Sequence, residues 1–165
     1  MIRKEIDRLQ YLCTVIPQLL KALDEETFTF KFSPDIRSPK EILGHLIDEA
    51  TNNYQTLART QLEQESQNFY DLHHWNRFGF YNKESQHQII FLWETYNRQL
   101  LQLIKSIPEA YLQKECYTAS GMLSIQSIIR NYMEELELHL ALFVNYPSEN
   151  RDAGEGQDGM PRALK

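Results

Sequence analysis

The chain has 165 residues, enough for one domain with a buried core. Hydrophobic residues make up 42% and charged residues 24%, which is the balance of a soluble globular protein. The net charge is −6 and no block of Lys or Arg occurs, which argues against a nucleic-acid partner.

The N-terminus and the two cysteines bear on location. The opening MIRKEIDRLQ lacks the apolar core of a signal peptide, and no segment has the ~18 consecutive apolar residues of a membrane span. Cys13 and Cys116 form no CxxC pair and are typical of buried thiols in a reducing compartment. We therefore expect a cytoplasmic protein with no membrane partner.

The first predicted helix runs from about residue 2 to about residue 26, with apolar residues at helical spacing. Pro17 interrupts it and predicts a kink, because proline removes a backbone hydrogen bond. The following FTFKFSPDIR is expected to be extended and to hold Phe28, Phe30 and Phe32 over the bundle.

The second predicted helix has a sharp start and runs to about residue 65. Ser38 can cap it, Pro39 suits the first helical position and Glu41 completes a capping box. The loop that follows, SQNFYDLHHWNRFGFYN, is dense in aromatic residues and histidine. Loops of this length in compact domains often serve a function or cover a site.

The third predicted helix runs from about residue 83 to about Ser106, and the fourth from a Ser124 cap to about Tyr146. After Pro147 the apolar periodicity is lost, which predicts a flexible tail. The expected fold is all-α, an antiparallel four-helix bundle over residues 1–146 with a long aromatic loop between helices 2 and 3, followed by a tail over 147–165.

Two polar residues interrupt the apolar stripe of the fourth predicted helix. Steps of three and four from Ile125 reach positions 128, 132, 135, 139, 142 and 146, and the middle of that stripe is Glu135 and His139. Carboxylate and imidazole are both metal ligands, and an unpaired buried carboxylate is costly. The two side chains could equally pair with each other, or with Arg59 or Arg98.

A third ligand is needed, and His45 in EILGHLIDEATNNY is the candidate. It lies off the apolar arc of its helix, so its face is either a solvated polar surface or the wall of a polar cavity. The polar residues grouped with it are Glu49, Asn52, Asn53 and Thr56.

SPKEILGHLIDEA, followed some ninety residues later by IRNYMEELELHLALF, resembles the DinB/YfiT-like superfamily of small four-helix proteins. The resemblance extends to about Tyr146 and includes the loop HHWNRFGFYN. It implies a divalent metal, usually nickel or zinc, held by three histidines with open positions. By position, His45, Glu135 and His139 would be the ligands.

Glu135 departs from the resembled pattern, because the family usually has histidine there. A set of two histidines and one glutamate is chemically sound for zinc, and iron or manganese would also suit it. The change could equally mark a member that has lost its metal. Tyr132 is expected in the core or in a pocket wall, Asp48 is expected either to orient a ligand or to pair with a cation, and His73, His74 and His87 are expected at the surface.

The catalytic group is expected to be a water or thiol activated by the metal, since such an ion lowers the pKa of either. No GxSxG elbow and no phosphate-binding glycine motif occurs. The resemblance implies a hydrolase or a thiol S-transferase with a small-molecule substrate and a low-molecular-weight thiol. The alternative is a non-catalytic, stress-linked binding or scaffold bundle without metal. A homodimer is compatible with either hypothesis.

Overall fold

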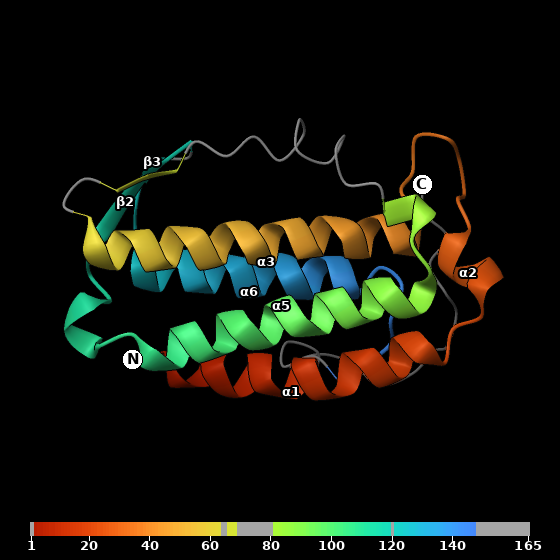
Figure 1. The fold of residues 1–165 in the computed structure, drawn as a ribbon, viewed down its shortest axis with the longest axis horizontal. Coiled ribbons are helices and arrows are strands. Elements are labelled where there is room, and N and C mark those ends of the chain that lie inside the picture. Colours follow the sequence, from red (N-terminus) through yellow and green to blue (C-terminus); the bar gives the residue numbers. More distant parts are fainter. Residues whose placement is uncertain (1, 64–65, 69–80, 120, 148–165) are drawn as a thin grey trace, which may run out of the picture.

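The computed structural model describes residues 2–63, 66–68, 81–119 and 121–147. Four long helices form a bundle (Figure 1): α1 (Arg3–Lys21), α3 (Pro39–Leu62), α5 (Gln86–Ser106) and α6 (Ile125–Leu140). The shorter elements are α2 (Glu25–Thr29), β1 (Ser66–Asn68), η1 (Tyr81–Lys83), η2 (Glu109–Tyr111), β2 (Glu115–Thr118) and β3 (Gly121–Ser124). The prediction of four main helices is therefore confirmed.

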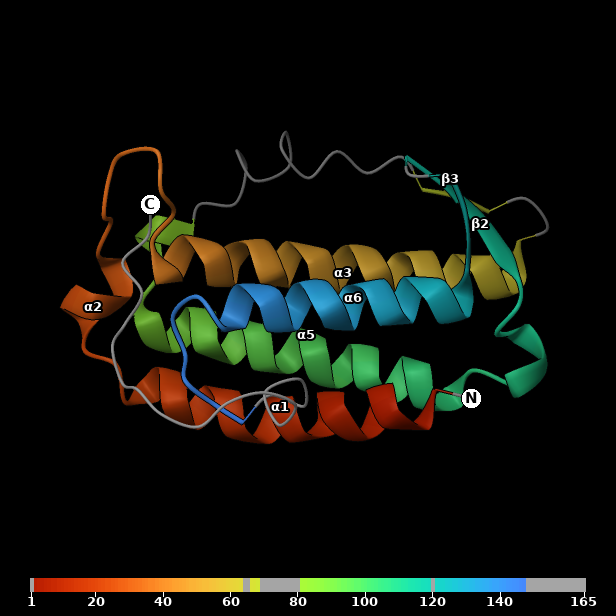
Figure 2. The same ribbon diagram turned by 180° about the vertical axis from the view of Figure 1, so that it is seen from behind.

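The direction of the helices differs from a simple antiparallel bundle. Figures 1 and 2 show that the neighbouring helices α3 and α5 run the same way, whereas α1 and α6 both run the opposite way. Parallel neighbours need a connection that returns along the whole helix, which for the 24 residues of α3 is about 36 Å. Residues 63–85 provide that connection, so the length of the aromatic loop has a topological reason.

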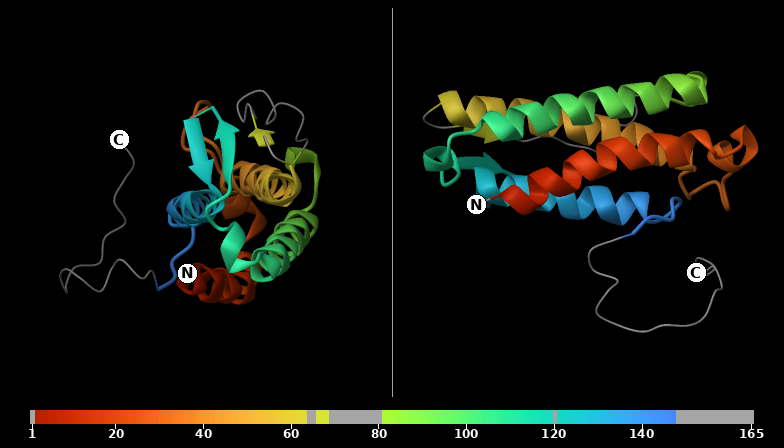
Figure 3. Two further views of the ribbon diagram at one scale, coloured as in Figure 1. Left: turned by 90° about the vertical axis from the view of Figure 1, so that its left-hand side faces the viewer. Right: turned by 90° about the horizontal axis from the view of Figure 1, so that it is seen from below.

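The buried hydrophobic residues that form the core come mainly from the four long helices. The left view in Figure 3 shows these helices end-on, grouped around a common axis. Helix α3 packs against both α5 and α6, and residues 42–50 in its first half are all buried. Its start is the predicted one: Ser38 Oγ accepts a hydrogen bond from the Glu41 N–H, and the Glu41 carboxylate accepts one from the Ser38 N–H. This capping box fixes where α3 begins and hence the height of its buried polar residues.

A small three-stranded sheet corrects the all-α prediction. Strands β2 and β3 form an antiparallel hairpin, and β1 pairs with β2 in parallel. Gly121 has φ +105°, a left-handed conformation that glycine adopts without a steric penalty, and it follows the hairpin turn. The strands have only three or four residues, too few for an alternating pattern to stand out in the sequence.

Two predicted helix ends and the predicted placement of two phenylalanines were wrong. The first helix ends at Lys21, and a separate helix α2 begins after Asp24, whose Oδ1 accepts a hydrogen bond of 2.7 Å from the Thr27 N–H. The fourth helix ends at Leu140 instead of residue 146. Among the three phenylalanines, Phe28 is fully buried, whereas Phe30 and Phe32 are 60% and 64% exposed and do not cover the bundle.

Several predictions fall outside the described residues. They concern the tail beyond Pro147 and most of the aromatic loop, including His73 and His74.

His87 lies within the described residues and is exposed, as expected. Of the helices in the described ranges, none is long and apolar enough to cross a membrane.

Candidate metal centre

The middle of α3 places three ionisable side chains in the interior. His45, Asp48 and Glu49 are only 8%, 6% and 7% exposed. Tyr81 covers this part of α3, and Gly44 permits the close approach, because a Cβ on Gly44 would lie 2.3 Å from Tyr81 Cδ2. The sequence allowed either a solvated or a buried position for His45, and the structure shows the buried one.

Two histidines and one glutamate form a cluster, which we call the His45 cluster: His45 and Glu49 on α3, and His139 on α6. One ligand atom from each lies within 4.8 Å of the others. Along α3, His45 Nε2 is 3.2 Å from Glu49 Oε1, one helical turn away. Across the helices, the two imidazole rings meet edge to face, with centroids 5.1 Å apart. These are the side-chain types that bind zinc, nickel or iron.

A backbone hydrogen bond orients His139. Its Nδ1 lies 2.9 Å from the carbonyl oxygen of Glu135, one turn earlier in α6. Because a carbonyl oxygen only accepts, Nδ1 must carry the hydrogen, and the lone pair of the neutral ring is then on Nε2. Histidines that bind metals commonly have their second nitrogen fixed in this way.

Glu135 itself does not join the cluster, although His45 and His139 do come together as predicted. Its side chain is 56% exposed, and its Oε2 lies 3.8 Å from His139 Nδ1. The buried stripe of α6 passes one position further along the chain, through Tyr132, Leu136 and Leu140. A step of one residue turns a helix by ~100°, which is enough to leave Glu135 at the edge of the bundle.

The carboxylate in this position is Glu49, which the sequence placed only among pocket residues. Its Oε2 is buried and has no hydrogen-bond partner within the described residues. The signal was available, because His45 and Glu49 have the same i, i+4 spacing as Glu135 and His139. A buried carboxylate oxygen without a partner is destabilising unless a cation or proton compensates it.

Asp48 and Tyr132 lie next to the cluster. Asp48 Oδ1 accepts a 2.6 Å hydrogen bond from the Tyr81 hydroxyl. Burial raises the pKa of Asp48, and the Tyr81 hydrogen bond opposes that rise. Burial also raises the pKa of Tyr132 well above its ordinary value, and the Tyr132 hydroxyl donates a hydrogen bond to Asn97 Oδ1. Tyr132 is thus a neutral wall residue.

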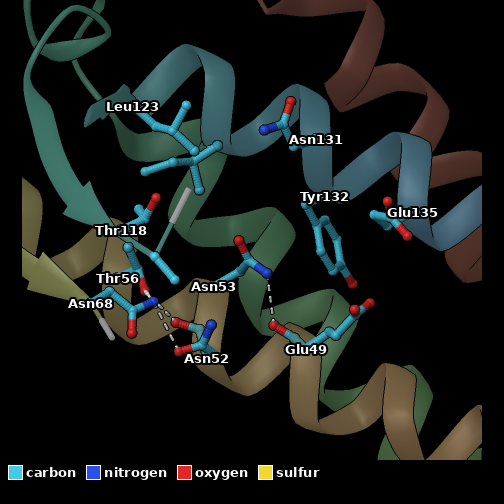
Figure 4. Close-up of a pocket in the computed structure, with 12 residues that line it drawn as sticks. Glu49, Asn52, Asn53, Thr56, Asn68, Thr118, Leu123, Asn131, Tyr132 and Glu135 are labelled. Carbon is cyan, nitrogen blue, oxygen red and sulfur yellow. Dashed lines mark hydrogen bonds between the residues drawn. The ribbon is translucent and has the colours of Figure 1, made fainter. Parts of the chain in front are cut away.

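A cavity of about 250 Å³, here called the α3–α6 cavity, begins beside the cluster. Figure 4 shows Glu49 and Tyr132 at one end, close to Glu135, with Asn52 and Asn68 toward the sheet. Asn68 Nδ2 donates to Asn52 Oδ1 at 3.1 Å, which links β1 to α3. Asn52 lines this cavity, as do Glu49 and Tyr132, so the polar face beside His45 is in part a cavity wall, one of the two environments that the sequence allowed.

Comparison with solved structures supports the fold. The chain is similar to YfiT from Bacillus subtilis, described as a probable metal-dependent hydrolase with an unusual four-helix bundle topology. The match has a TM-score of 0.75 at 13% identity and covers 86% of this chain and 82% of that one. No family model and no curated protein matches the sequence. The predicted resemblance is thus confirmed as a likeness of fold: this chain has the four-helix architecture of YfiT.

Proposed function

We propose that His45, Glu49 and His139 bind one divalent metal ion, and that the chain is a metal-dependent enzyme. The observation that carries the proposal is the buried, unpartnered Oε2 of Glu49 beside two imidazoles. The resemblance favours nickel or zinc, and this donor set also suits iron or manganese.

The geometry fits such an ion after a small contraction. Ligand atoms that lie ~2.0–2.2 Å from a tetrahedral zinc ion are about 3.3–3.6 Å from one another. The pair His45 Nε2 and Glu49 Oε1 is already at 3.2 Å, whereas the widest spacing in the cluster is 4.8 Å or less. Rotation of the partly exposed His139 side chain about its own bonds can supply the difference.

A divalent ion held here would act as a Lewis acid and would lower the pKa of a water or thiol bound to it. The chain's own residues shape the surroundings. Glu49 is the ligand that borders the α3–α6 cavity, so a substrate would approach from that side. Asp48 and Tyr81 fix the opposite side by holding the start of η1 against α3.

The proposed reaction is hydrolysis or transfer of a low-molecular-weight thiol to an electrophile. The description of YfiT as a probable metal-dependent hydrolase favours hydrolysis. The two activities separate experimentally when metal-loaded protein is assayed for ester and amide cleavage, and in parallel for thiol consumption with a chloro-dinitrobenzene. A protein that binds metal but does neither would favour the non-catalytic alternative. Cytoplasmic location and a homodimer stay predictions.

Calorimetric titration of metal-free protein with nickel and zinc tests the ligand set. We expect one ion per chain, and weakening of at least about 10–100-fold for Glu49→Gln and for His139→Ala, as even the loss of an outer hydrogen-bond partner has that effect. The matched control is Glu135→Gln, which removes the same charge from the same neighbourhood. We expect Glu135→Gln to leave the affinity nearly unchanged. A loss confined to Glu135→Gln would restore Glu135 as the ligand, and equal losses or an unaffected Glu49→Gln would refute the assignment.

A further inference from the structure

The α3–α6 cavity is large enough for a small organic molecule. Its 250 Å³ corresponds to about eight water molecules in the liquid, at ~30 Å³ each. Helices α3 and α6 form its sides, and residues of β1, β2 and β3 close the end away from the His45 cluster. Figure 4 shows these side chains converging from both helices and from the sheet.

The charged side chains that line the cavity are all acidic. Within the described residues, the lining includes two carboxylates, Glu49 and Glu135, and no Lys, Arg or His. An anionic group in this cavity would leave water without gaining a basic side chain in exchange, which is unfavourable. A cationic group would instead find a carboxylate at the end near the cluster. The lining therefore discriminates by charge.

The remaining lining is rich in amides, with four asparagines and two threonines. Part of this set is already used: Asn68 Nδ2 donates to Asn52 Oδ1 and to Thr56 Oγ1, and Asn53 Nδ2 donates to the Glu49 carbonyl. Asn131, one turn before Glu135 on α6, makes no hydrogen bond within the described residues. Asn131 therefore offers unused polar atoms to a ligand in the cavity.

We propose that the α3–α6 cavity binds the substrate, and that this substrate carries a primary ammonium group next to hydrogen-bonding groups such as amides. The ammonium group pairs with Glu135 at the cavity edge, and the polar body contacts Asn131 and Asn53. This assignment rests on the proposed function only in placing the reacting group toward Glu49 and the metal. The binding preference itself follows from the lining.

Three probes of similar size separate the charge states: leucinamide (cation), N-acetylleucinamide (neutral) and N-acetylleucine (anion). Binding to metal-free protein is measured by ligand-observed NMR titration. We expect leucinamide to bind at least about tenfold more tightly than N-acetylleucine, because the lining carboxylates attract the ammonium group and repel the carboxylate of the anion. Equal or tighter binding of N-acetylleucine would overturn the proposal.

Substitutions then locate the interaction. Glu135→Gln should weaken leucinamide binding about two- to fivefold, as expected for a partly exposed ion pair. The matched control Glu134→Gln removes the same charge from an exposed neighbour on α6 and should leave the affinity unchanged. Asn131→Trp, at an exposed position, should block the cavity and abolish binding without changing the melting temperature. Equal effects of the two glutamate variants, or binding unaffected by Asn131→Trp, would refute the location.

Metal-free protein keeps the two proposals apart. Loss of charge selectivity in these titrations would overturn the substrate assignment alone. Failure to bind nickel or zinc would overturn the metal centre and leave the cavity result standing.

Discussion

Replacing Gly44 by Ala tests how the structure covers the candidate metal centre. The new Cβ would lie 2.3 Å from Cδ2 and 2.5 Å from Cγ of Tyr81, so the ring must move. Its movement would break the 2.6 Å hydrogen bond from the Tyr81 hydroxyl to Asp48 Oδ1. Asp48 is 6% exposed and its other carboxylate oxygen already has no partner within the described residues.

The expected magnitude follows from three contributions. Overpacking costs about 1–3 kcal/mol, and loss of a buried hydrogen bond to a carboxylate costs about 1–3 kcal/mol. Alanine in a helix interior gains about 1 kcal/mol over glycine. Gly44→Ala should therefore lower the free energy of unfolding by about 1–5 kcal/mol. At ~2–4 °C per kcal/mol for a chain of this size, the melting temperature should drop measurably.

The effect should shrink when the ring is absent. In a Tyr81→Ala background only the Cβ of residue 81, 3.0 Å from the new Cβ, stays close, so Gly44→Ala should cost at least about 1 kcal/mol less than in the parent. Tyr81→Phe separates the contributions, because it removes the hydroxyl and keeps the ring. The assay is urea unfolding followed by circular dichroism for the four proteins of the cycle and for Tyr81→Phe. If Gly44→Ala has the same effect with and without Tyr81, the packing of Tyr81 on α3 is wrong.

Three further predictions concern the rest of the chain. Ser38→Ala should destabilise by about 0.5–2 kcal/mol in urea unfolding, because it removes half of the capping box; no change would mean that the box does not stabilise α3. Burial raises the pKa of the Cys13 thiol to about 12, so Cys13 should resist iodoacetamide at pH 8 in the folded protein and should react in urea. Mass spectrometry measures the labelling, and rapid labelling of the folded protein would contradict the burial of Cys13. Truncation after Pro147, whose carbonyl accepts a hydrogen bond from Arg8, should leave the melting temperature within about 5 °C; a larger drop would show that the tail contributes to stability.

Local signals in the sequence predicted local structure well. The Ser38 capping box and the Ser124 cap were both found, because each depends on residues three apart in the chain. The parallel pairing of α3 and α5 was not predicted, since helix direction depends on how a long connection returns and leaves no periodic trace. The hairpin around Gly121 was missed for the opposite reason: its strands are too short to carry a pattern.

The candidate site was predicted in part. His45 and His139 come together as expected, although they are far apart in the chain, because the family resemblance supplied a long-range pairing that periodicity lacks. The carboxylate beside them is not the predicted one. The predicted stripe of α6 ran through Glu135, whereas the buried stripe runs through the next position, Leu136. Glu49 was overlooked as a candidate ligand because the polar face of α3 resembles a solvated surface in the sequence, whereas in the structure α6 packs against α3 and Glu49 is buried.

The most direct test is a crystal structure of the protein grown or soaked with zinc or nickel, with data collected at the metal absorption edge. The account predicts one anomalous peak per chain, within about 2.0–2.2 Å of a nitrogen of His45, a nitrogen of His139 and a carboxylate oxygen of Glu49. A peak coordinated by Glu135 in place of Glu49 would correct the ligand set. No peak among these side chains would contradict the metal centre.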